Sequence, residues 1–304
     1  TMAAQQPCAV DTESPPPTAQ MAADDQRKPP LGWRNWSNLA AYIVNSVVTY
    51  VSLTGIFGET NGDLSDKYHT LVTPAGWAFS IWGVIFIGEA AAVVAQMFPR
   101  YRGLEVVRAS TPWWLAACAF QVCWTIVFAQ EVIWLSVVCM LGILVGLVGM
   151  AVVTDGISLT VDEYWVLRVP FAVHLGWIVA ASALNINVLA DASSASPSTL
   201  LGIAVLALAA VLLMVAGFAL LPQRPEPTVG VVAVWALAAI AAELGDGENL
   251  NSPTRFRPYA WDDVITSGLR FAVVGLAVAS GLLAVVAIAL RLLPTWRSFR
   301  EARQ

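Results

Sequence analysis

The sequence predicts an all-α fold of about eight membrane-spanning helices, and two observations support that prediction. Charged residues make up only 12% of the 304 residues, hydrophobic residues make up 58%, and the mean hydropathy is +0.68. A soluble domain carries about 25% charged residues, so this composition argues against a water-soluble enzyme. The charges are also unevenly spread, and the stretches between them have about the 20 residues that cross a hydrocarbon core.

The membrane spans can be placed in order along the chain. We expect them at 37–57, 74–98, 111–130, 132–153, 168–190, 199–221, 228–244 and 268–293. Pro74, Pro112 and Pro170 should lie near the starts of their helices, where the missing N–H of proline costs nothing. Only the residues around Glu131 separate the third span from the fourth, so these two spans should form a tight antiparallel hairpin.

The segments outside the spans predict the tails and the orientation. Residues 1–31 are rich in proline and poor in apolar residues, which predicts a disordered tail, and residues 295–304 form a basic C-terminal tail. With eight spans, 12 of the 16 Lys and Arg residues fall on the side of the amino terminus and four on the other. The positive-inside rule therefore predicts an integral membrane protein with both termini in the cytosol.

Tryptophan is the most informative residue type, with 13 copies. Eight of them flank the spans, as expected for an interfacial aromatic belt, namely Trp33, Trp36, Trp113, Trp114, Trp134, Trp165, Trp261 and Trp296. The other five lie deeper, where an indole N–H needs a partner, and are Trp77, Trp82, Trp124, Trp177 and Trp235. Composition alone leaves two interpretations open, which are ordinary packing and a pocket for a flat apolar ligand.

Aromatic motifs follow one another along the second, third and fifth spans. They are Thr73-Pro74-Ala75-Gly76-Trp77 with Trp82, Phe120-Gln121-Val122-Cys123-Trp124 with Phe128, and Trp177 followed by Leu184-Asn185. Their order resembles the TspO/MBR family, the tryptophan-rich sensory proteins that include the mitochondrial translocator protein. The resemblance covers residues 37–190, and the three spans at 199–293 have no counterpart in the five-helix form. The chain is therefore similar to a longer, divergent branch of the family.

The resemblance implies a five-helix bundle at 32–191, followed by three additional helices at 192–294. It also implies a pocket among the five helices for a porphyrin, such as a haem precursor, or a sterol-type lipid. Carried over by position, the pocket residues are Pro74, Trp77, Trp82, Trp124, Trp177 and Asn185. The loop at 58–73 would close the pocket, and in it Lys67, Tyr68 and His69 could meet the carboxylates of a porphyrin.

Two ionisable residues are expected at membrane depth, Glu89 in the second span and His174 in the fifth. Such groups are costly in hydrocarbon and should face a partner or a cavity. One hypothesis places both at the pocket, with His174 as a ligand of haem iron or of a propionate. The other is a protonated Glu and a His bonded to a neighbouring carbonyl.

Several functions are disfavoured by what the sequence lacks. No Ser/His/Asp arrangement stands out, so we expect no catalytic residue. The sequence has no CxxC motif or Cys/His cluster, so we expect no metal site. It also has no run of basic residues that would bind nucleic acid. We expect no required cofactor, with haem or porphyrin only as ligand, and membrane lipids and a small hydrophobic molecule as partners. The sequence leaves open whether the protein forms a homodimer. It also leaves open two other functions: a secondary transporter coupled to protons through Glu89, and a scaffold protein that docks through Ala204, Ala207 and Ala210.

Overall fold

A computed structural model describes residues 30–246 and 261–293 of the chain, and this part is helical without any strand. Most of the predicted N-terminal tail, the C-terminal tail and Trp296 lie outside the described residues. The elements, in order, are α2 (Trp33–Ser52), α3 (Asn61–Lys67), η1 (Gly76–Ser80), α4 (Ile81–Ala95), α5 (Glu105–Ala129), α6 (Ile133–Val153), α7 (Val161–Leu167), α8 (Val169–Ala192), α9 (Pro197–Leu220), α10 (Pro227–Glu243) and α12 (Asp263–Leu292).

Each predicted span overlaps a helix, which confirms the polytopic helical fold, although α2 ends at Ser52 and not at the predicted residue 57. Six helices in the described part are long and apolar enough to cross a membrane, namely η1 with α4, α5, α6, α8, α9 and α12. The other two are α10, which is apolar but has only 17 residues, and α2. The prediction for Pro112 is wrong, because α5 begins at Glu105 and the proline lies inside the helix.

Polar side chains on one face of α2 explain why this helix is less apolar than the others. Nδ2 of the buried Asn38 donates to Gln96 Oε1 at 2.9 Å and to Thr111 Oγ1 at 3.1 Å. Trp114 donates its indole N–H to the Asn38 carbonyl at 3.2 Å. Trp114 and Trp261 are buried, so these two do not belong to the predicted interfacial belt. Their side chains are used for packing inside the protein instead.

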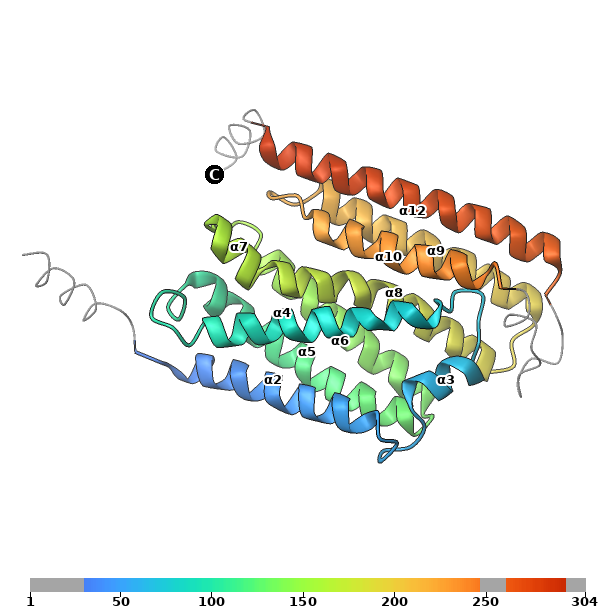
Figure 1. The fold of residues 1–304 in the computed structure, drawn as a ribbon, viewed down its shortest axis with the longest axis horizontal. Coiled ribbons are helices and arrows are strands. Elements are labelled where there is room, and N and C mark those ends of the chain that lie inside the picture. The colour runs from blue at the N-terminus through green and yellow to red at the C-terminus, as the bar shows by residue number, and fades with distance from the viewer. Residues whose placement is uncertain (1–29, 247–260, 294–304) are drawn as a thin grey trace, which may run out of the picture.

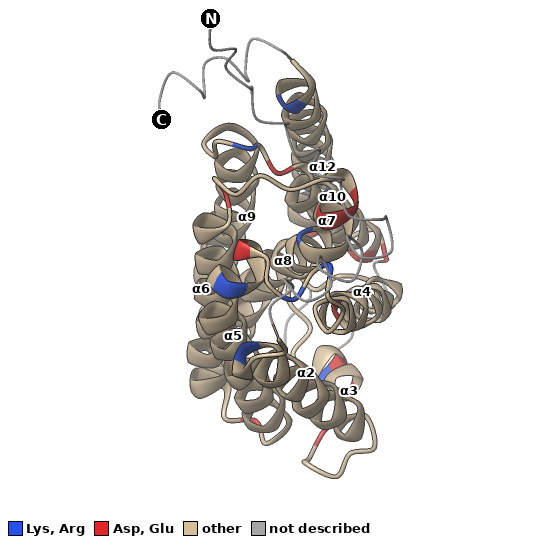
Figure 2. Cartoon of the chain, turned by 90° about the vertical axis from the view of Figure 1, so that its left-hand side faces the viewer, with Lys and Arg blue, Asp and Glu red and all other residues tan. Residues whose placement is uncertain are grey.

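The helices are arranged around α8 (Figure 1). α8 contacts α4, α6 and α7 on one side and α9 and α10 on the other. It is also the most buried of the candidate spans, with 61% of its apolar window covered, against 22% for α12 at the edge. Figure 2 shows that the bodies of the helices carry few charged residues. A charge-poor bundle with an apolar outer face is what a hydrocarbon solvent requires.

Candidate ligand-binding site

A narrow cavity lies among α4, α5, α6, α8 and α10, with the α3 segment over one end. Its wall is formed by residues that include Leu64, Tyr68, Pro74, Phe79, Trp82, Trp124, Phe128, Met140, Trp177, Leu184, Asn185, Val188, Ala236 and Ile240. The cavity volume is about 50 Å³. This is room for a few water molecules and far less than the 300–1,000 Å³ or so of a typical ligand pocket. A large ligand therefore has to widen the cavity as it enters.

Indole rings from three separate helices meet at this cavity. Trp82 comes from α4, Trp124 from α5 and Trp177 from α8. The rings of Trp82 and Trp177 lie edge to face, with centroids 6.3 Å apart and an interplanar angle of 83°. Phe79 meets Trp177 in the same manner at 5.8 Å. Edge-to-face contacts thus join three aromatic side chains of the cavity wall.

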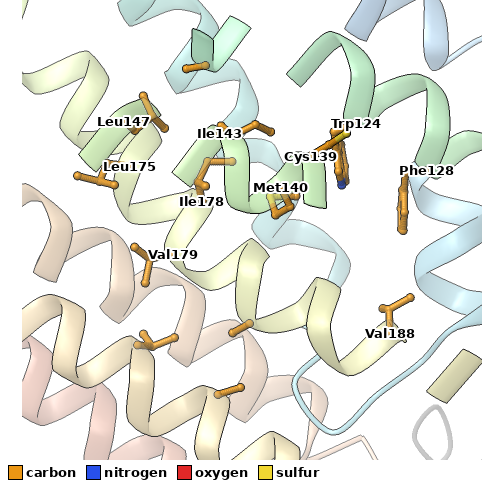
Figure 3. Packing of buried hydrophobic residues seen from close by; sticks show 14 of the residues in the cluster. Trp124, Phe128, Cys139, Met140, Ile143, Leu147, Leu175, Ile178, Val179 and Val188 are labelled. Atoms are coloured by element: carbon orange, nitrogen blue, oxygen red, sulfur yellow. The ribbon is translucent and has the colours of Figure 1, made fainter. Parts of the chain in front are cut away.

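Trp124 forms a second aromatic wall with Phe128, one helical turn further along α5. Their rings are stacked, with centroids 5.0 Å apart and an interplanar angle of 14°. Figure 3 shows the two rings side by side, with Met140 of α6 near Trp124 and Val188 of α8 below Phe128. The walls around these rings are apolar, which suits a flat apolar molecule.

Two polar groups in this wall are unsatisfied. The indole N–H groups of Trp124 and Trp177 are buried and have no hydrogen-bond partner. Leaving a buried donor unpaired costs about 1–3 kcal/mol, and an explanation is expected for each such group in a native protein. Asn185 is also buried in the wall, where its Oδ1 accepts from Ser136 Oγ at 3.0 Å. Both tryptophans are among the residues that line the cavity.

The predicted lid residues take three different positions. Tyr68 is buried and lines the cavity. Lys67 Nζ lies 2.6 Å from Oε2 of Glu131, at the turn between α5 and α6. His69 turns the other way, with Nε2 2.9 Å from Oε1 of Glu243 at the end of α10. Of the three, only Tyr68 reaches the cavity, and the other two fasten the loop to its neighbours.

Glu89 and His174 are paired with each other and do not line the cavity, contrary to the first hypothesis. Nδ1 of His174 lies 2.6 Å from Oε1 of Glu89, and both side chains are almost completely buried. His174 Nε2 and Glu89 Oε2 have no partner. The ring of Trp82 stands edge-on to the imidazole at 5.7 Å. The pair thus lies directly behind an aromatic residue of the cavity wall.

Trp77 is a further correction, because it lies outside the cavity. Its side chain is 48% exposed and meets the ring of Trp235 edge to face at 4.8 Å. Trp82 follows Trp77 by five positions, which would place the two side chains about 140° apart around an α-helix. The 3-10 turn η1, which holds Trp77, changes this angle but does not bring the two indoles to one face.

The wall also contains residues that the sequence did not single out as ligand contacts. Phe128 belongs to the aromatic motif of the third span and Phe79 lies three residues before Trp82, so both could have been chosen by their helical spacing from tryptophan. Ala236 and Ile240 come from α10, outside the five-helix unit, and nothing in their sequence context marks them. The cavity thus spans the boundary at residue 191 that the sequence predicted.

These features define a class: a polytopic helical membrane protein with an aromatic cavity inside its bundle. A family profile described as TSPO-like protein matches residues 35–254, more than half of the chain. The chain therefore belongs to the TSPO-like family, which confirms the resemblance seen in the motifs. The matched region includes α9 and α10 and stops before α12. No curated protein and no solved structure was found to match the chain.

Proposed function

We propose that this TSPO-like protein binds a flat apolar ligand, a tetrapyrrole or a sterol-like lipid, in the cavity among α4, α5, α6, α8 and α10. Binding would serve to sense, buffer or transfer that ligand within the membrane. The observation that carries the proposal is the convergence of Trp82, Trp124 and Trp177, two of them with unpaired N–H groups, on one cavity. Aromatic rings stack on a flat ligand, and a buried indole N–H can donate to a carboxylate or hydroxyl.

The small volume of the cavity agrees with a pocket that opens for its ligand. The α3 segment is held over one end by contacts at its ends, while its own body is a short helix of seven residues. Movement of this segment and of the aromatic side chains would widen the cavity. Ligand entry is then coupled to lid movement, as in many sites that close over a substrate.

Titration with protoporphyrin IX tests this function. The purified chain should quench its tryptophan emission and shift the porphyrin absorption band on binding. Trp177→Phe removes one N–H and part of one wall, so the dissociation constant should rise about threefold to tenfold. Trp134→Phe is the matched control, because Trp134 is 62% exposed and lies outside the cavity. Equal affinities for the two variants would refute the proposed site.

A second candidate function, proton-coupled transport, is favoured by the Glu89–His174 pair. Ionisable residues inside a membrane bundle often belong to proton relays, and this pair contacts the aromatic wall through Trp82. In proteoliposomes with a trapped pH-sensitive dye, porphyrin addition should then move protons. Glu89→Gln should abolish the proton movement while porphyrin binding persists. If the native chain bound porphyrin without moving protons, transport would be ruled out and ligand binding would remain as the function.

A further inference from the structure

A second, much larger hollow lies at the opposite end of the bundle. It is a groove between α7, the start of α10 and the end of α12, with a volume of about 980 Å³. Figure 1 shows these segments at the end that also holds the start of α2, far from α3 and the lid. The groove shares no residue with the aromatic cavity. The groove is therefore a separate site, although α10 contributes to both walls.

The lining of the groove is amphipathic. Aliphatic side chains from four helices form one part of it, namely Val161, Val169, Val231, Ile288 and Leu292. Arg224, Arg291 and several hydroxyl-bearing residues form the other part, and no Asp or Glu is among the lining residues. Trp165, 62% exposed, stands at the groove as an interfacial tryptophan does. This pattern fits a molecule with an apolar body and an anionic head.

Arg291 is the cation best placed to meet such a head. Its guanidinium lies 4.0 Å from the ring centroid of Tyr164 and 4.0 Å from Glu226 Oε2, which is beyond hydrogen-bond distance. Its side chain is 23% exposed. The stacking on Tyr164 fixes the direction of the guanidinium, and its N–H donors stay available for an anion.

Glu226 is shared between Arg291, at 4.0 Å, and closer partners that satisfy its two oxygens. The buried Arg168 donates through Nε to Glu226 Oε2 at 3.2 Å, and Tyr164 and Thr228 donate through their hydroxyls to Oε1 at 2.9 and 2.6 Å. Burial and the neighbouring Glu226 charge raise the pKa of Tyr164, so this phenol stays protonated and continues to donate. Arg291 is thus in a long ion pair with Glu226, and its guanidinium lines the groove.

Arg224 forms the second cationic side of the groove and ties the loop before α10 to the segment before α7. Its guanidinium donates to the Ile157 carbonyl and to Ser158 Oγ, and Asp155 accepts from its backbone N–H at 3.0 Å. These contacts hold the polar end of the groove in a fixed shape. A preformed site of this kind lowers the cost of ordering on binding.

We propose that the groove binds an anionic phospholipid, with the phosphate at Arg291 and Arg224 and the acyl chains along Val169, Val231 and Ile288. The charge of the lining favours this lipid over a zwitterionic one, because a basic residue near a membrane attracts anionic headgroups. The open apolar wall favours a lipid over a free phosphate, which would leave that wall in contact with water.

Native mass spectrometry of the full chain tests the assignment. The protein is equilibrated with equal amounts of phosphatidylglycerol and phosphatidylcholine, and the retained lipid is counted. The native chain should retain phosphatidylglycerol in preference, and Arg291→Gln should cut that retention about fivefold. Arg291→Lys should retain most of it. Arg34→Gln is the matched control, because it removes an exposed charge at the same end but outside the groove, and it should change nothing.

Two further experiments separate a lipid site from a free phosphate site. Val231→Trp fills the groove without changing its charge, so it should also lower lipid retention, while an unchanged circular dichroism spectrum should report that the protein is folded. Inorganic phosphate should fail to displace the lipid, and displacement would instead identify a free phosphate site. Equal retention of both lipids, or equal loss in Arg291→Gln and Arg34→Gln, would overturn the proposal.

Discussion

Tyr68 and Glu131, 63 residues apart in the sequence, are joined by a hydrogen bond of 2.7 Å from the tyrosine hydroxyl to Oε2. Lys67 Nζ contacts the same carboxylate oxygen at 2.6 Å. Glu131 forms the turn between α5 and α6 with a positive φ of 58°, so its position is fixed by two helices. The contacts therefore fasten the α3 segment over the cavity, with Tyr68 inside and Lys67 at the rim.

Weakening this fastening should speed ligand entry. Glu131→Gln keeps an acceptor for Tyr68 but removes the ion pair with Lys67, which is partly exposed and worth about 0.2–1 kcal/mol. The association rate of protoporphyrin IX, measured by stopped-flow quenching, should rise about twofold to fivefold. Glu59→Gln, an exposed carboxylate in the same loop, is the control. An unchanged rate in Glu131→Gln would mean that ligand enters by another route.

The buried pair of Glu89 and His174 should behave as one unit in stability. Removing one partner, as in His174→Phe, leaves a buried carboxyl group uncompensated and should cost about 3–5 kcal/mol of unfolding free energy. The double variant Glu89→Leu with His174→Phe removes both polar groups and should recover much of that loss. Thermal unfolding in detergent, followed by circular dichroism, measures both. Additive losses would show that the two side chains do not depend on each other.

Trp77 and Trp82 should differ in function although both stand in the same motif. Trp82→Leu removes an indole from the cavity wall and should weaken protoporphyrin binding about threefold to tenfold. Trp77→Leu changes a half-exposed side chain outside the cavity, so binding should stay as in the native chain. Isothermal titration gives both affinities. A weaker complex in the Trp77 variant alone would place the ligand on the outer face, beside Trp235.

The spans could be predicted from sequence because the membrane allows few solutions. A bilayer requires every backbone group to be paired within the segment, so a long charge-free stretch such as 199–221 predicts a helix directly. That Trp82, Trp124 and Trp177 meet was predicted from the family resemblance. The residue pattern within one helix does not fix how that helix is rotated against its neighbours. The structure places all three around one cavity, and their contact with a ligand stays a prediction.

Contacts between distant segments could not be predicted in the same way. Glu89 and His174 were expected at membrane depth, but their pairing depends on how α4 and α8 are rotated, which the hydrophobic pattern hardly specifies when both helices are apolar on all sides. The link from Tyr68 to Glu131 joins a loop to a turn and leaves no periodic signal. The role of α10 in the cavity wall was hidden for a similar reason, because alanine marks no site.

That role of α10 leads to a last prediction, on Gly176. A Cβ at this position would lie 2.7 Å from Val232 Cβ and 3.3 Å from Val229 Cα, so only glycine allows α8 and α10 to approach as closely as they do. Gly176→Ala should therefore push the helices apart and lower the unfolding free energy by about 1–3 kcal/mol. Because Trp177 follows this glycine and Ala236 of α10 lies in the cavity wall, porphyrin affinity should fall as well.

Gly202 of α9 supplies the matched control for this substitution. A Cβ there meets nothing within 4 Å, so Gly202→Ala should keep or raise the melting temperature, since alanine in a helix interior is favoured over glycine by about 0.5–1 kcal/mol. The two alanine variants should thus shift thermal unfolding in opposite directions, and only the Gly176 variant should bind porphyrin more weakly. If both raised the melting temperature, α8 and α10 would have room to separate without cost, and α10 would not be an integral wall of the cavity.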